Sequence, residues 1–361
     1  RQIVEKVILL DSDWPKISVA RVEATLPPLP PITSAAPLRG TRATHEYQER
    51  AAFDALKRHD LTFGTGGELM IMTRCYGRDG LWNSTTMPWE GVSVVSQTGT
   101  LIVDLAVTGV HDEHNDPVST CVLSVSPGAY RLRYTLPQGG HVEQSLILPP
   151  GSWRLEAYLL IYESSRPRLS LLMRPIGSSW GTEDVLLEKS LVALADERPI
   201  LNDELTDLLL LKFANPLAGI VGGHLLLIKQ EYGGARSSDL LDIVVTNLRE
   251  LVGPEHPDVE ALSLACKNPD LHRKLPIASP PLLERSWRMI INASQDRPQL
   301  VPLSLWTGVH ATIPAPPFLM WSADAGLRRD FTQDLARAVF GSPSEAAPRS
   351  EPPLGAGAGD Q

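Results

Sequence analysis

The densest group of possible metal ligands in this sequence is the run from His111 to Asp116. It places the imidazoles of His111 and His114 three residues apart, with carboxylates beside them. Histidine and carboxylate side chains at this spacing can hold a divalent metal ion. The run also lies between two predicted strands and ends in Asp116-Pro117, a pair typical of turns. Because a hydrated hairpin loop accounts for these residues without a ligand, we expect no bound metal and no other cofactor.

A second group combines cationic and aromatic side chains in one stretch, namely Arg74, Tyr76, Arg78, Trp82 and Trp89. Guanidinium groups bind anions and stack on aromatic rings, so such a group can hold a base or a phosphate. These five residues are therefore our candidate ligand-binding residues. The same side chains can instead form a rim around a small aromatic core, and that alternative stays open.

Residue types and spacing give little support for nucleophilic catalysis. Cys75 stands beside Arg74 and near Arg78, which can lower the pKa of a thiol, but a Cys–His pair needs the fold to bring a histidine close. The sequence contains no G-x-S-x-G elbow. His224 lies in an apolar helical segment, where we expect a hydrogen-bonded core histidine. We predict no catalytic residue, and a hydrolase that uses Cys75 or the His111–His114 loop remains an alternative.

These candidate groups lie in a segment, residues 61–180, that has the pattern of a β domain. Short β-prone runs are separated by turn signals such as Gly66-Gly67, Thr98-Gly99 and Gly139-Gly140, without intervening helices. Two turns share one form, in which Pro127-Gly128 and Pro150-Gly151 precede an aromatic residue and an alternating strand. The pattern predicts an antiparallel β-sandwich-like domain or an open barrel.

Residues 181–340 carry helix signals instead, so the predicted fold class is α+β, an antiparallel β domain followed by an α-helical domain. We expect Asn202 to cap one helix, Asn215-Pro216 to open another, and Gly253-Pro254 to end a third. Ser279-Pro280 is expected to open a further helix. The predicted helices cover residues 185–195, 202–213, 216–230, 239–251, 258–266, 279–293 and 327–340.

Both ends of the chain differ from these two domains in composition. Residues 1–60 contain one or two predicted strands, a proline-rich stretch at 24–37 that favours an extended linker, and a helix at 45–58. Pro, Ala, Gly and Ser dominate residues 341–361, for which we expect a disordered tail. Because the chain begins with Arg1 and not with methionine, we expect a piece of a longer polypeptide.

Composition and charge limit the classes of protein to which the chain can belong. A hydrophobic fraction of 43% over 361 residues is ordinary for a globular protein with two domains. A net charge of −9 argues against a nucleic-acid-binding surface over the whole chain. No segment approaches the roughly 18 apolar residues of a membrane helix. Three widely spaced cysteines fit free thiols in a reducing compartment, so we expect a cytoplasmic protein.

Three stretches together resemble a known group of proteins. They are residues 212–227, which contain Asn215-Pro216 and Gly222-Gly223-His224, residues 251–259, which contain Gly253-Pro254, and the paired Pro-Gly turns described above. Over residues 60–310 the sequence resembles the non-catalytic region that accompanies caspase-like peptidase domains in large bacterial proteins of conflict or immune systems. The resemblance implies sensing, recruitment or restraint beside a Cys-His peptidase, and no catalytic residue in this chain.

Two further hypotheses therefore stand beside the hydrolase. In the leading one, the chain is a non-enzymatic regulatory or scaffolding module of a bacterial defence system. It would bind a protein partner such as a caspase-like protease domain or subunit. The second is a sensor that binds a small nucleotide-like molecule between the β and helical domains, because ligand pockets favour domain interfaces. We expect neither a membrane nor a nucleic acid as partner.

Overall fold

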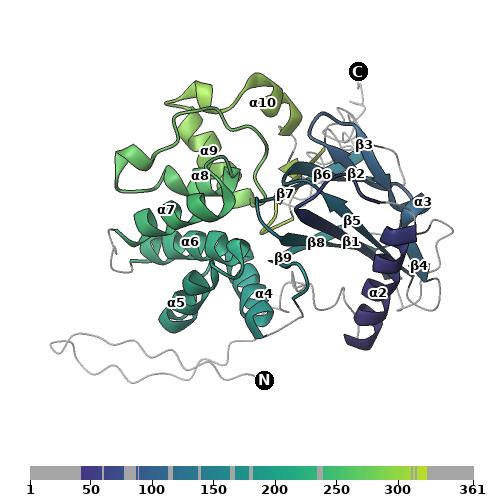
Figure 1. Ribbon diagram of the computed structural model, residues 1–361. Coiled ribbons are helices and arrows are strands. Elements are labelled where there is room, and N and C mark those ends of the chain that lie inside the picture. The colour runs from purple at the N-terminus through teal and green to yellow at the C-terminus, as the bar shows by residue number, and fades with distance from the viewer. Residues whose placement is uncertain are drawn as a thin grey trace, which may run out of the picture.

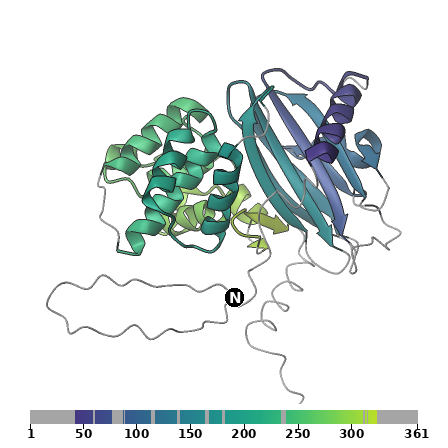
Figure 2. The ribbon, with the colours of Figure 1, turned by 90° about the horizontal axis from the view of Figure 1, so that it is seen from below.

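The computed structural model of this protein is a mixed α/β structure. It describes residues 42–58, 61–76, 87, 89–112, 117–136, 140–162, 167–178, 182–233, 239–309, 312–313 and 315–322. Within these residues lie two β-sheets and nine α-helices. The sheets form one side of the molecule and helices α4 to α9 the other, with β10 and β11 between them (Figures 1 and 2). The predicted strands within 1–23, the proline-rich stretch, the helix at 327–340 and the tail lie outside the described residues.

The first sheet has five strands in the order β4-β5-β1-β8-β9. Their bounds are Val110–Asp112, Val118–Val125, Gly67–Tyr76, Trp153–Tyr162 and Arg168–Pro175. The expectation of purely antiparallel pairing is wrong at one place, because β1 and β8 run parallel, with Gly67 opposite Trp153. The reason is topological. Three short turns follow β5, which is antiparallel to β1, and each turn reverses the chain, so β8 enters in the direction of β1.

The second sheet has six strands in the order β10-β11-β7-β6-β2-β3. Their bounds are Thr312–Ile313, Met320–Ser322, His141–Leu148, Gly128–Thr135, Val92–Ser96 and Leu101–Asp104. The chain thus returns to this sheet after the helices, and Met320 pairs with Gln144 of β7. These two strands were not predicted from the sequence, because runs of two and three residues carry no alternation that could be detected.

The two Pro-Gly turns form as predicted. Gly128 has φ +155° and Gly151 has φ +114°, a backbone region that residues with a Cβ rarely adopt. A Cβ on Gly151 would also lie 2.7 Å from Nε1 of Trp153. These positions therefore need glycine, and both turns place an aromatic residue at the start of the following strand.

Helix α2, Arg42–Arg58, contains the predicted helix at 45–58 and lies against β5 and β4 (Figure 2). Arg154 of β8 fixes it to the sheet. Its Nε donates to Glu68 at 2.8 Å, its Nη1 pairs with Glu49 of α2, and its guanidinium lies 4.6 Å from the ring centre of Phe53. Arg154 is buried, so these charge-assisted contacts hold helix and sheet together.

The helical part follows the predicted order, with two errors at helix starts. The helices there are α4 (Thr182–Ala195), α5 (Asn202–Leu211), α6 (Pro216–Glu231), α7 (Leu240–Val252), α8 (Pro257–Ser263), α9 (Glu284–Ser294) and α10 (Leu303–Val309), of which α10 was not predicted. The short helix α3 (Leu105–Thr108) lies between β3 and β4, where no intervening helix was expected. Asn215 caps α6 as predicted, but Leu201 and not Asn202 is the N-cap of α5. Helix α9 begins at Glu284 and not at Ser279-Pro280, because Pro281 disfavours a helical conformation for Pro280.

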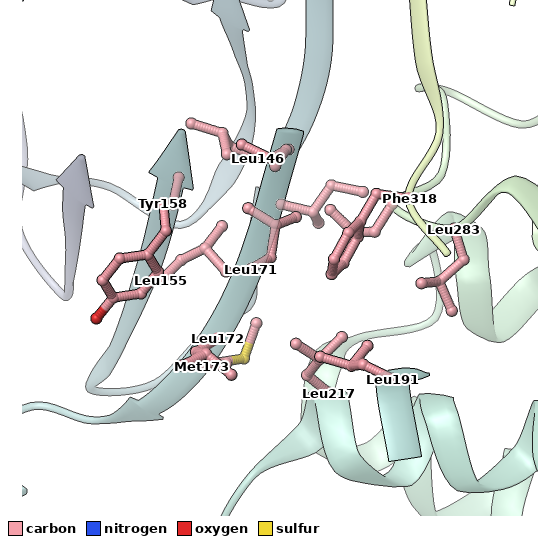
Figure 3. Close-up of a cluster of buried hydrophobic side chains, with 14 of the residues drawn as sticks. Leu146, Leu155, Tyr158, Leu171, Leu172, Met173, Leu191, Leu217, Leu283 and Phe318 are labelled. Carbon is pink, nitrogen blue, oxygen red and sulfur yellow. The ribbon is translucent and has the colours of Figure 1, made fainter. Parts of the chain in front are cut away.

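A continuous apolar core joins the helices to the sheets. We call this junction the seam; it consists of β9 and residues 315–319 on one side and α4, α6 and α9 on the other. Figure 3 shows Leu171 and Met173 of β9 facing Leu191 and Leu217, with Phe318 between β9 and Leu283. The backbone is also tied across the seam, since Leu319 N–H donates to Leu282 O at 2.8 Å. The seam therefore fixes the start of α9 relative to the sheets.

Candidate functional site

Of the five cationic and aromatic candidates, the structure describes the side chains of only two. Arg74 is buried in β1, between Val118 of β5 and Leu160 of β8. Trp89 is buried and stacks on His111, with 4.3 Å between ring centres. This position fits the aromatic-core interpretation for Trp89. The side chain of Tyr76 and the residues Arg78 and Trp82 lie outside the described part of the chain.

Of the two histidine candidates, the structure describes only His111. His111 lies in strand β4 rather than in a loop, and its Nδ1 is 2.9 Å from the hydroxyl of Ser119. Ser119 is fully buried, so its hydroxyl is closed to a substrate, whereas His111 is half-buried. His114 lies outside the described residues. Among the residues that the structure describes, no group of three His, Cys, Asp or Glu side chains is arranged to hold a metal ion.

The described cysteines are buried thiols. Burial raises the pKa of Cys121 to about 11 and that of Cys266 to about 12, so both stay protonated and poorly nucleophilic at neutral pH. The side chain of Cys75 is outside the described part of the chain. No described cysteine therefore has the environment of an activated nucleophile.

His224 is the core histidine that the sequence predicts. It is fully buried in α6, and its Nε2 lies 2.8 Å from Oγ of Ser286 in α9. Ser286 also bonds to the carboxylate of Asp258, whose two oxygens accept the N–H groups of Leu282 at 2.8 Å and Leu283 at 3.0 Å. All three side chains are sealed from solvent. The cluster therefore positions the first turn of α9 and has no access for a substrate.

The buried cluster predicts how stability changes with pH. Burial lowers the pKa of His224 and of His256 to about 3, and it raises the pKa of Asp258 to about 6. Between pH 6 and 4 the unfolded chain protonates both histidines, whereas the folded chain protonates Asp258. In this range the unfolded chain therefore binds one proton more than the folded chain at these three groups. The stability present above about pH 6.5 is lost on acidification, and the free energy of unfolding falls by about 1.4 kcal/mol per pH unit.

Urea denaturation at pH 4, 5, 6 and 7 checks this prediction. His224→Gln, which keeps a hydrogen-bonding group near Ser286, removes one of the two histidines. The difference in unfolding free energy between the wild type and this variant should then fall by about 1.4 kcal/mol for each pH unit between 6 and 4. A difference that does not change with pH would mean that His224 is protonated in the folded state.

A surface pocket of about 240 Å³ lies at the seam. Its walls come from the end of α4, the first turns of α9 and the segment that leads to β11. The lining residues are Leu194, Ala195, Glu197, Glu284, Arg285, Arg288, Pro316 and Pro317. We call it the seam pocket. It brings four charged groups together from positions that are about 90 residues apart in the sequence.

The backbone turn that ends α4 places Glu197 at the seam pocket. Arg198 N–H donates to Ala193 O at 3.0 Å and Glu197 N–H to Leu194 O at 3.1 Å, the hydrogen-bond pattern of a Schellman motif. Its left-handed position usually holds glycine, yet here Glu197 occupies it with φ 50°. Among the described residues, it is the one non-glycine with positive φ. Backbone strain of this kind concentrates at functional sites.

The charges of the seam pocket are only partly compensated. Arg288 donates to Glu197, and this bond lowers the pKa of Glu197. Arg285 pairs with Glu231, but its Nε is buried without an acceptor. Burial raises the pKa of Glu284, and no hydrogen bond to its carboxylate occurs among the described residues. The seam pocket therefore contains one guanidinium N–H without an acceptor and one half-buried carboxylate that has Arg288 as an electrostatic partner but no hydrogen bond among the described residues.

Glu197→Gly tests whether this glutamate is present for stability. Glycine relieves the left-handed strain, and the exposed ion pair with Arg288 contributes little. After the entropy that glycine adds to the unfolded chain, we expect the free energy of unfolding to rise by about 0.5–1 kcal/mol. Thermal denaturation of both proteins measures the change. A loss above 1 kcal/mol would show that Glu197 is a structural residue.

The seam pocket was not predicted from the sequence. Pro199, two residues after Glu197, indicated where a helix ends, since proline commonly follows a helix end. The spacing of Arg285 and Arg288 places both on one face of a helix. Neither signal indicates that these two segments meet.

Comparisons with known proteins add no relative. No protein-family model, no curated protein and no solved structure matches the chain. Within the described residues, no helix is both long and apolar enough to span a membrane.

Proposed function

We propose that this chain is a non-enzymatic regulatory module that binds a small molecule in the seam pocket. One observation carries the proposal. A strained glutamate, a guanidinium N–H without an acceptor and a half-buried carboxylate without a hydrogen bond among the described residues line the same pocket. The strain at Glu197 and the unsatisfied Nε–H of Arg285 are costly for a fold to retain unless a ligand uses them.

The position of the pocket supports a regulatory role. Its walls include Pro317, whose carbonyl accepts the N–H of Glu284 at 2.9 Å, and this bond ties the start of α9 to the chain that returns to the second sheet. A ligand that contacts both walls would stabilise the seam. Occupancy would then change how firmly the helices are held against the sheets.

Burial of the described reactive groups supports binding rather than catalysis. Ser119, Ser286 and Cys121 are each sealed in the core, and Asp258 is engaged by two backbone N–H groups. A group that cannot touch a substrate cannot act on it. We extend the proposal to a cytoplasmic location, in keeping with the buried free thiols of Cys121 and Cys266.

A second candidate function is the binding of a protein partner. Helix α10 exposes Leu303 and Trp306 three residues apart on one face. Tryptophan is enriched among the residues that contribute most to binding at protein interfaces. The resemblance to regions that accompany caspase-like peptidases suggests the partner class, a peptidase domain or subunit encoded with this chain. Leu303→Asp should then abolish co-purification with that peptidase, and Leu101→Asp, at another exposed leucine, in β3, should not.

Filling the seam pocket tests the leading proposal. Ala195 lines the pocket, whereas Ala214 is exposed after α5, so Ala195→Phe and Ala214→Phe make the same chemical change inside and outside the site. Melting temperatures are measured with a panel of small acids, amines and amino acids. A true ligand at about 100 times its Kd adds about 2.7 kcal/mol of stability to the wild type and to Ala214→Phe, and nothing to Ala195→Phe. Equal responses of both variants would refute the site.

A further inference from the structure

We propose that the ligand of the seam pocket is a zwitterion of the α-amino acid type, with its ammonium group on Glu284 and its carboxylate on Arg285 and Arg288. This inference rests on the proposed function and names the class of molecule that the site would take. It follows from the incompletely hydrogen-bonded groups, the apolar wall and the size of the pocket.

The two incompletely hydrogen-bonded groups lie on consecutive residues at the start of α9. Glu284 interacts electrostatically with Arg288 but accepts no hydrogen bond among the described residues, and an ammonium ion would supply its carboxylate with a donor. Arg285 lines the pocket and keeps a buried Nε–H without an acceptor, and a turn of its side chain toward the ligand would let this N–H donate to a carboxylate oxygen. A ligand with both groups therefore satisfies a donor and an acceptor that have no hydrogen bond among the described residues.

Arg288 can take the second carboxylate oxygen. Its Nη2 donates to Glu197, and a guanidinium has five N–H donors in all. Because Glu197 already holds Arg288 at the pocket, this guanidinium is positioned before the ligand arrives. The left-handed backbone of Glu197 thus acquires a role, since it sets the direction of that ion pair.

The remaining wall is apolar and consists of Leu194, Ala195 and the ring of Pro317. It suits an aliphatic side chain. The volume of about 240 Å³ lies just below the roughly 300–1,000 Å³ typical of pockets for drug-sized ligands. The pocket therefore suits a small molecule, and an amino acid with a branched aliphatic side chain is of that size.

Calorimetric titration of the full chain with three related probes tests the class of ligand. L-Valine carries both charged groups, L-valinamide lacks the carboxylate, and isovalerate lacks the ammonium group. We expect L-valine to bind at least about tenfold more tightly than either analogue, since each loses one charge-assisted contact. Glu284→Gln should remove the preference for L-valine over isovalerate. Arg198→Gln, at an exposed arginine that pairs with Asp196 outside the pocket, should change nothing.

Each other outcome overturns the inference in a recognisable way. Equal binding of L-valine and isovalerate, both lost in Ala195→Phe, would keep the seam pocket as a ligand site and reject the zwitterion. Binding of L-valine that survives Ala195→Phe would reject this pocket as the site. If none of the three probes binds at millimolar concentration, the amino acid class is wrong, and the wider panel of the preceding section decides whether another small molecule takes its place.

Discussion

Replacing Phe318 by alanine is expected to lower the free energy of unfolding by about 3–5 kcal/mol. Phe318 is fully buried at the seam, in the same apolar core as Leu171 of β9 and Leu283 (Figure 3). Its removal leaves a cavity between two layers that long-range contacts hold together, so the neighbouring side chains can fill it only in part. Urea denaturation, followed by circular dichroism, measures the loss.

Phe213→Ala is the matched control for this substitution. This substitution makes the same chemical change at a phenylalanine that is 59% exposed and has Lys212 lying over its ring. We expect a change within about 0.5 kcal/mol there. If Phe318→Ala lowered the free energy of unfolding no more than Phe213→Ala, the seam would not be a shared core. A ligand in the seam pocket could then not affect both the sheets and the helices.

Asp258→Ala is expected to lower the free energy of unfolding by about 3–5 kcal/mol at pH 7. The carboxylate accepts the N–H groups of Leu282 and Leu283 in the dry interior. Without it, two buried donors lose their partner, and each costs about 1–3 kcal/mol. The first turn of α9 also loses its anchor, so binding to Glu284 and Arg285 should weaken in the same variant.

Asp207→Ala serves as the control, because Asp207 is an exposed carboxylate of α5. Its loss should change the unfolding free energy by no more than about 0.5 kcal/mol. Hydrogen exchange at Leu282 and Leu283 gives a second readout, since both amides should exchange faster in Asp258→Ala alone. Unchanged exchange together with a small loss of stability would mean that another group holds these amides.

Local signals in the sequence predicted local structure well. The Pro-Gly turns at 127–128 and 150–151 form because glycine alone tolerates their backbone angles. Asn215 caps α6 because its side-chain oxygen reaches the amide of Ala218. Such features depend on a few neighbouring residues, and the printed sequence contains all of them.

Long-range structure was beyond those signals. The parallel pairing of β1 with β8 depends on the number of reversals between them, and β11 joins β7 across about 180 residues. The seam pocket shows the same limit. Glu197, Glu284 and Pro317 meet only because the seam closes, so no spacing in the sequence could place them together. The ligand-binding candidates predicted from the sequence were therefore residues near one another along the chain, such as Arg74 and Trp89.

The arginine side-chain N–H signals test most directly whether the seam pocket is a ligand site. Protein labelled with ¹⁵N is titrated with L-valine, and the Nε–H resonances of Arg285 and Arg198 are followed by NMR. We predict that the Arg285 signal shifts in a saturable way as its unpaired Nε–H gains an acceptor, whereas the signal of Arg198, already paired with Asp196, stays fixed. An Arg285 signal that does not move at saturating L-valine, or one that moves equally with Arg198, would contradict the account.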